Sequence, residues 1–315
     1  MLSGTDRQLR FLMALPTIRV FILSIALLAA GSCFAQEITP RAYWPAPKGT
    51  KLLVFAYGHQ AGDVITAASL PVEGAESRSN SVILGYQTTL SLFGRSANLQ
   101  FEIPIASGST RANLEGLPVR RDVKGMGDIA ATLSVNLLGA PSLSPEAFQS
   151  FRQQPRPILG LGIKMVAPTG QYDDDKLVNI GSNRWSARVR LGYIQPLTER
   201  WILELSAGTW FFQDNKDFVG GVREQKPVTA FDFSLIRRIR PGFWASLDGT
   251  HYVGGRTTVD DTINVDYQRN SRLGFSVAYP FANRHLWKFS FTNDIRTEFG
   301  GDYNTVTFSY AYRLR

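Results

Sequence analysis

Cysteine, histidine and charge are all scarce in this chain of 315 residues. It contains one cysteine and three histidines, and charged residues make up 19% of it. The cysteine, Cys33, lies close to the N-terminus, so cleavage of a leader after Ala35 would leave the mature chain without any. That absence excludes disulfides, thiol catalysis and cysteine-ligated metals.

Long apolar runs are also lacking. The run Val20–Ala30 is too short to span a bilayer, which takes roughly 20 residues. Three arginines precede it and mostly small residues follow it as far as Ala35, which predicts a secretory signal peptide over residues 1–35. Lipoprotein processing at Cys33 is the alternative, although the usual leucine three positions before the cysteine is missing.

The charge balance does not point to nucleic acid. The leader holds three arginines against one aspartate, so the formal net charge of +8 leaves +6 on the mature chain. Its lysines and arginines do not cluster among exposed aromatic residues, and we therefore expect no nucleic-acid partner. We also expect no cofactor, because Gly254-Gly255-Arg256 lacks the lysine and the helix of a phosphate loop.

What the sequence does contain is a recurring alternation of apolar and polar residues. Period-2 alternation is typical of strands, because successive side chains point to opposite faces. The pattern predicts about twelve strands of about ten residues each, which is long enough to cross a membrane with tilt. The alternating positions lie within Leu53–Tyr57, Val82–Leu92, Ala97–Ile105, Ile129–Leu137, Leu159–Met165, Trp185–Tyr193, Trp201–Phe211, Phe231–Leu235, Phe243–Val253, Leu273–Tyr279, Trp287–Ile295 and Val306–Leu314.

The lengths of the connections also alternate. Tight connections are predicted at Phe93–Ser96, Pro196–Arg200, Arg238–Gly242 and Phe281–His285. Long polar loops are predicted at Gln60–Ser81, Ser107–Gly125, Pro168–Asn183, Asp214–Lys226 and Gly254–Asn270. Outer-membrane barrels have short periplasmic turns and long outer loops. Two connections break the rhythm: Glu298–Asp302 is short, and Gly139–Arg156 is long, with a helix start at Ser144-Pro145-Glu146.

These features together predict an all-β fold: a transmembrane antiparallel up-and-down β-barrel of about twelve strands, after a cleaved signal peptide. Residues 36–50 would form a periplasmic N-terminal segment or a lumen plug, and residues 51–315 the barrel. Aromatic residues near the strand ends, such as Trp185 and Trp287, are expected at the membrane interfaces. A secreted β-sandwich is the alternative, but that fold does not require short and long connections to alternate.

Several motifs resemble one family. They are Pro168-Thr169-Gly170-x-Tyr172, Lys176-Leu177-x-Asn179-x-Gly181-x-Asn183-x-Trp185, Trp210-Phe211-Phe212-x-Asp214-Asn215, Arg223-Glu224-Gln225, Pro241-Gly242-x-Trp244-Ala245-Ser246-Leu247-Asp248, Gly254-Gly255-Arg256-Thr257-Thr258 and Gln268-x-Asn270-Ser271-Arg272. The chain thus resembles the outer-membrane transporters named for the meta-pathway of phenol degradation. The resemblance implies an outer-membrane barrel of about this size and a role in the uptake of small compounds, aromatic ones included.

The polar rows of the strands would face the lumen. The charged side chains predicted to point inward are Lys164, Arg184, Arg188, Arg190, Arg272, Lys288, Arg313, Glu102, Asp128, Glu204, Asp232 and Asp248. We expect Arg184, Arg188, Arg190, Lys164, Arg272, Glu204, Asp232 and Asp248 to line the pore and contact solutes. One hypothesis is that Arg184, Arg188 and Arg190 form a basic stripe that favours anions. The alternative is that these charges pair and hold the wall together.

The function expected is passive uptake of small, aromatic or anionic solutes through the outer membrane of a Gram-negative bacterium, with both termini in the periplasm. The partners would be outer-membrane lipid and lipopolysaccharide, the barrel assembly machinery and the solutes. A structural or adhesive barrel is the alternative. A lipid hydrolase is a further one, with His59, His251 and His285 as the available histidines and Ser246 near His251. Asp173-Asp174-Asp175 is a candidate cation site without the spacing of a calcium loop.

Overall fold

The computed structural model describes residues 40–65, 72–176 and 178–314. The predicted signal peptide, residues 1–35, lies outside the described residues. No helix in the described part of the chain has the length and apolar character needed to cross a bilayer.

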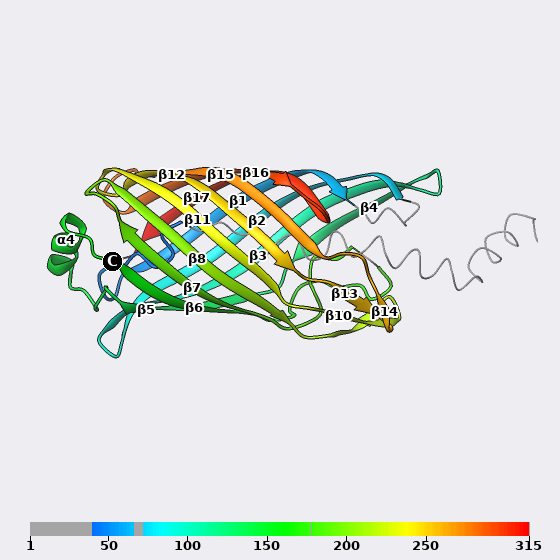
Figure 1. Ribbon diagram of the computed structural model, residues 1–315, viewed down its shortest axis with the longest axis horizontal. Helices are drawn as coiled ribbons and strands as arrows, with labels where there is room; N and C mark the ends of the chain where they lie inside the picture. The colour runs from blue at the N-terminus through cyan, green and yellow to red at the C-terminus, as the bar shows by residue number, and fades with distance from the viewer. Residues whose placement is uncertain (1–39, 66–71, 177, 315) are drawn as a thin grey trace, which may run out of the picture.

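Twelve long antiparallel strands close into one barrel (Figure 1). They are β1 (Lys51–Ile65), β2 (Val72–Leu92), β3 (Arg95–Leu114), β5 (Ala130–Leu138), β6 (Ile158–Val166), β7 (Ser186–Pro196), β8 (Trp201–Phe212), β11 (Val228–Arg240), β12 (Phe243–Gly254), β15 (Gln268–Pro280), β16 (His285–Arg296) and β17 (Gly300–Arg313). The first of these, β1, pairs with both β2 and β17, so the sheet has no free edge along its wall. The predicted fold and strand number are confirmed.

The outer face of the barrel is apolar. Phe55, Leu191 and Phe275 are each at least 40% exposed, and every one of the twelve strands contributes exposed large apolar side chains. The opposite rows, which point inward, hold buried polar residues such as Asp232 and Arg272. An apolar band outside and a polar interior are what a bilayer requires, so the predicted assignment of the two faces is correct.

One end of the barrel, which we call the turn end, carries the short connections. Phe93 and Gly94 form the β2–β3 turn, with φ of 50° and 75°. The long β5–β6 connection at this end contains the helix α4 (Pro145–Gln153), which is seen at the left end of the barrel in Figure 1. Its predicted start is confirmed, because Ser144 caps it by accepting a hydrogen bond from the N–H of Ala147.

The other end, the loop end, holds more strand than the sequence predicts. Gln60–Ser81 and Ser107–Gly125 were expected to be loops, but most of their described residues extend β1, β2 and β3 or form β4 (Leu117–Met126). That expectation was wrong because the extensions of β1, β2 and β3 are mostly polar or small, and because Arg121 interrupts the short apolar row of β4, so the period-2 signal is weak. Their backbone groups nevertheless pair as a normal ladder.

The strand β3 changes neighbour at Pro104. Its turn-end half pairs with β5 and its loop-end half with β4. Pro104 has no N–H to donate, and it lies between the two pairings, where its carbonyl accepts from the N–H of Gly127. A proline in a continuous strand is therefore accommodated where the ladder is already interrupted.

A second, small sheet forms at the loop end (Figure 1). Its strands are β9 (Asn215–Phe218), β10 (Gly221–Gln225), β13 (Thr257–Val259) and β14 (Thr262–Ile263), in the order β14-β13-β10-β9. They come from the β8–β11 and β12–β15 connections, which the sequence predicts as loops. The β6–β7 connection contains Pro168–Asn183 and has no strand in its described part.

An apolar core fills the turn end from within. Ile158, Ile194, Ile202 and Ile236 are fully buried there around Tyr43. Tyr43 donates its hydroxyl hydrogen to the carbonyl of Arg190 at 3.0 Å. Residues 48–50 then leave this core, with the N–H groups of Lys48 and Gly49 bound to the carbonyls of Leu143 and Thr89.

Glycines make room for the Tyr43 ring. A Cβ at Gly160 or Gly192 would overlap ring carbons of Tyr43, and one at Gly162 would lie 3.0 Å from its hydroxyl oxygen. The sites on β6 and β7 that face this ring therefore require the absence of a side chain. The Cβ atoms would lie 2.1 Å and 2.2 Å from the nearest ring carbons, and real Cβ atoms essentially never approach another atom within 3.0 Å.

We expect Gly192→Ala to lower the free energy of unfolding by about 2 kcal/mol, because the added methyl overpacks the Tyr43 ring. Urea titration of the protein in lipid bilayers measures this. In the background of Tyr43→Ala, which removes the ring, Gly192→Ala should cost much less. Equal effects in the two backgrounds would show that the ring is not what the glycine accommodates.

Candidate functional site: the charged lumen

A cavity of about 450 Å³ occupies the lumen next to the turn-end core. Residues 40–46 bound it on one side, and its wall comes from β1, β2, β3, β5, β6, β7, β12 and β16. Its charged lining residues are Arg41, Lys164, Arg188, Arg190, Lys288 and Glu102. Five basic groups against one acidic group give this space an excess of positive charge.

Two of these arginines share one carboxylate. The Nη2 atoms of Arg188 and Arg190 lie 3.4 and 3.3 Å from the same Oδ2 atom of Asp232. Asp232 also accepts hydrogen bonds from the hydroxyls of Ser206 and Thr250, at 2.8 and 2.9 Å. One carboxylate therefore serves two arginines, and Glu204 is a further acid close to Arg190.

The other lumen ion pairs lie along the wall. Lys164 on β6 donates to Glu102 on β3 at 2.6 Å, with β5 between them. Arg272 and Asp294, on the adjacent strands β15 and β16, form two hydrogen bonds of 2.7 and 2.8 Å. These contacts tie neighbouring strands together, as the alternative interpretation of the lumen charges expects.

The two remaining predicted acids also point inward. Glu204 accepts a hydrogen bond of 2.5 Å from the N–H of Arg41. Asp248 accepts from the hydroxyls of Ser246 and Ser276, at 3.0 and 2.8 Å. Glu204 thus anchors the N-terminal segment, and Asp248 is held within a buried network of serines.

Arg184 lies apart from Arg188 and Arg190. It precedes β7 at the loop end, where it donates to the side chain of Gln225 and lies over the ring of Phe212. The three arginines alternate along one strand face, but their contacts divide them between two places. Two further predicted inward residues also lie elsewhere: Asp128 binds the β6–β7 connection, and Arg313 is exposed at the turn end.

Arg41 is a lumen residue that the sequence pattern does not predict, because it lies before the first alternating segment. Its guanidinium lies 4.6 Å from the ring centre of Trp44 and 5.6 Å from that of Trp244. Burial lowers the pKa of Arg41 to about 10, while the charge of Glu204 acts in the opposite direction. Arg41 therefore remains charged at neutral pH and adds to the positive side of the cavity.

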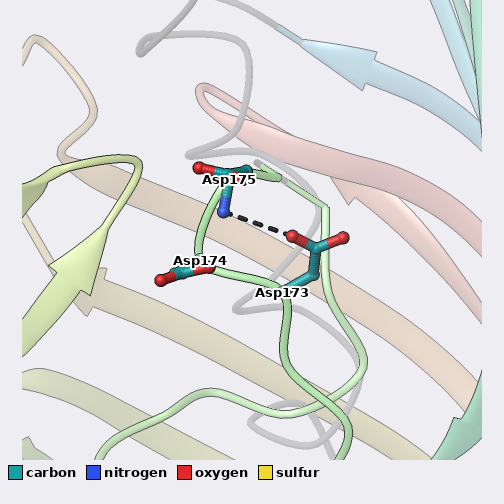
Figure 2. A group of neighbouring side chains, drawn as sticks. All are labelled: Asp173, Asp174 and Asp175. Carbon is teal, nitrogen blue, oxygen red and sulfur yellow. Dashed lines mark hydrogen bonds between the residues drawn. The ribbon is translucent and has the colours of Figure 1, made fainter.

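The three consecutive aspartates form an exposed group in the β6–β7 connection (Figure 2). One carboxylate oxygen from each lies within 4.8 Å of the others. The N–H of Asp175 donates to Asp173 at 3.2 Å, and Arg121 lies 3.9 Å from Asp173. Asp173 therefore has partners within the protein, the N–H of Asp175 and the guanidinium of Arg121.

The histidines do not form a triad within the described residues. His251 contacts the hydroxyl of Ser271 at 2.9 Å on the outer face, and no carboxylate in this part of the chain binds its ring. Ser246 points inward, on the opposite face of β12, and bonds to Asp248. His59 and His285 contact Asn80 and Tyr310. Ser246 therefore cannot act with His251 as a hydrolase would require.

The fold and the charged lumen define the molecule as a transmembrane β-barrel of the outer-membrane type. The chain belongs to the family described as "Putative MetA-pathway of phenol degradation", whose profile matches residues 59–313. The family resemblance drawn from the motifs is thereby confirmed.

Two solved structures share this fold. An outer membrane channel from Pseudomonas putida F1 is 23% identical, with a TM-score of 0.76, and the match covers 88% of this chain and all of that one. The transport unit of the autotransporter AIDA-I from Escherichia coli is 10% identical, with a TM-score of 0.54 over 93% of this chain and 99% of that one. A search of curated proteins returned no match.

We expect Asp232→Asn to lower the free energy of unfolding by about 3 kcal/mol, because it removes the carboxylate shared by two buried arginines. Urea unfolding in bilayers measures the change. The matched control is Asp122→Asn, which breaks an exposed pair with Arg120 and should leave unfolding unchanged. An equally small effect of both substitutions would show that Asp232 is not needed to hold the wall.

Proposed function

We propose that this protein is an outer-membrane channel for the passive passage of small anionic solutes. The observation that carries the proposal is the lumen cavity, which is lined by five basic side chains and one acidic one. A charged lining sets the selectivity of a pore, because it raises the local concentration of the opposite charge. Aromatic anions are included in the solutes because of the family description.

The family and the fold support a transport role. The solved relative from Pseudomonas putida F1 is described as an outer membrane channel. By the rule that periplasmic turns are short, the turn end would face the periplasm together with both termini. The barrel would then contact outer-membrane lipid and lipopolysaccharide and would be inserted by the barrel assembly machinery.

The N-terminal segment, residues 36–50, would constrict the lumen as a plug. Its described part, residues 40–50, supports this role because Tyr43 is buried in the turn-end core and residues 40–46 bound the cavity. Solutes that enter from the loop end would meet this segment before they reach the periplasm. Passage would then require either a narrow path beside Tyr43 or movement of the segment.

A structural barrel is the second candidate. The pair Arg272–Asp294 and the shared carboxylate of Asp232 stabilise the wall irrespective of transport. A structural barrel needs a filled lumen and no net selectivity. Conductance of the purified protein therefore distinguishes the two candidates.

We expect the purified protein to conduct in planar bilayers with a preference for chloride and benzoate over potassium. Lys288→Gln should lower the anion-to-cation permeability ratio by about twofold, because it removes one lumen charge. Reversal potentials in a salt gradient measure the ratio. Lys124→Gln, at an exposed site on β4, is the control and should not change it. If the protein produces no conductance in the bilayer, or if Lys288→Gln leaves the permeability ratio unchanged, the protein is not an anion channel of the kind proposed.

We expect Tyr43→Ala to increase the single-channel conductance, because the side chain fills the turn end of the lumen. The matched control is Tyr57→Ala, on the outer face of β1, which should leave the conductance unchanged. An unchanged conductance in Tyr43→Ala would remove the plug from the proposal and leave the selectivity argument intact.

A further inference from the structure

Two buried arginines at the loop end lack a carboxylate partner. Arg184, just before β7, and Arg223, on β10 of the small sheet, are each 5% exposed. Among the described residues, no acidic oxygen lies within ion-pair distance of either guanidinium. Buried arginines are normally paired, so two adjacent exceptions need a physical explanation.

The two side chains approach the same place. Arg184 donates from Nη2 to the side chain of Gln225. Gln225 lies two residues after Arg223 on β10, so both point to the same face of that strand. The Nη1 atom of Arg184 and the Nε atom of Arg223 are buried and have no hydrogen-bond partner in the part of the chain that the structure describes. The N–H donors left without acceptors thus come from both arginines.

The neighbouring acids are occupied by other donors. Asp266 accepts from the N–H and the hydroxyl of Thr257, at 2.9 and 2.5 Å. Asp128 accepts from the N–H groups of Gly170 and Ser182, both at 2.8 Å. Asp214, the remaining acid near Arg184, is exposed. These carboxylates act on the two guanidinium groups only from a distance, and none of them accepts from the Nη1 atom of Arg184 or the Nε atom of Arg223.

Both guanidinium groups lie over aromatic rings. Arg184 lies 4.6 Å from the ring centre of Phe212, and Arg223 lies 5.3 Å from that of Phe218. A guanidinium that lies over a ring can still donate its N–H groups to a planar oxyanion. Burial lowers the pKa of Arg184 to about 9, and the nearby charge of Arg223 acts in the same direction. An anion between the two groups would relieve both effects.

We propose that Arg184 and Arg223 form a binding site for a carboxylate at the loop-end mouth of the barrel. The carboxylate would accept hydrogen bonds from the unpartnered Nη1 of Arg184 and Nε of Arg223. The site is separate from the lumen cavity, whose lining includes neither residue. It goes beyond the proposed channel function, because binding here does not depend on conduction.

Isothermal titration of the detergent-purified mature protein with benzoate tests the site. We expect wild type to bind benzoate, and Arg184→Gln or Arg223→Gln to weaken the affinity by about tenfold, because each removes one charge-assisted hydrogen bond. The matched control is Arg256→Gln. Arg256 also lies over an aromatic ring at the loop end, that of Tyr267, but it is exposed, so its substitution should leave the affinity unchanged.

Absence of benzoate binding by wild type would overturn the proposal. So would affinities of Arg184→Gln and Arg223→Gln equal to wild type, since the benzoate would then bind elsewhere, and the channel function would be unaffected. If either variant fails to fold, bromide soaked into crystals of wild type decides the matter. An anomalous peak between the two guanidinium groups supports the site, and its absence overturns it.

Discussion

Backbone hydrogen bonding in a medium without water is the constraint on which this structure depends. In a bilayer every strand must pair on both sides, because an unpaired N–H or carbonyl has no solvent to bind. The pairing of β1 with β17, from Leu52 opposite Arg313 to Ile65 opposite Gly300, meets this need by closing the sheet. Closure then assigns one face of every strand to lipid and the other to the lumen.

The inward face has to satisfy its polar groups within the protein. Asp232 does so for two arginines at once, and Lys164 and Arg272 each have an acid on a nearby strand. At the turn end the interior is instead apolar, because isoleucines and Tyr43 fill it as they would fill the core of a soluble protein. The positive excess is therefore concentrated between this core and the loop end, where a solute would meet it.

The twelve strands and the orientation of their faces could be predicted because both depend on local alternation. One further feature of the sequence indicates where the N-terminal segment binds inside the barrel. Ile194, Ile202 and Ile236 are apolar on the rows that are otherwise polar, so both faces of these strand ends are apolar. That break in the pattern marks an interior core, although it does not identify Tyr43 as its centre.

The alternation of residues along the chain is enough to predict the barrel, its outer face and the strand rows that carry the inward charges, since a period of two is read from neighbouring residues. Which of these charges meet depends on how the strands pair and the loops fold. Arg188 reaches Asp232 because β8 alone separates β7 from β11, and Arg184 lies near Arg223 because the small sheet folds over the loop end. Such contacts depend on strand register and barrel closure, which join residues far apart in the chain.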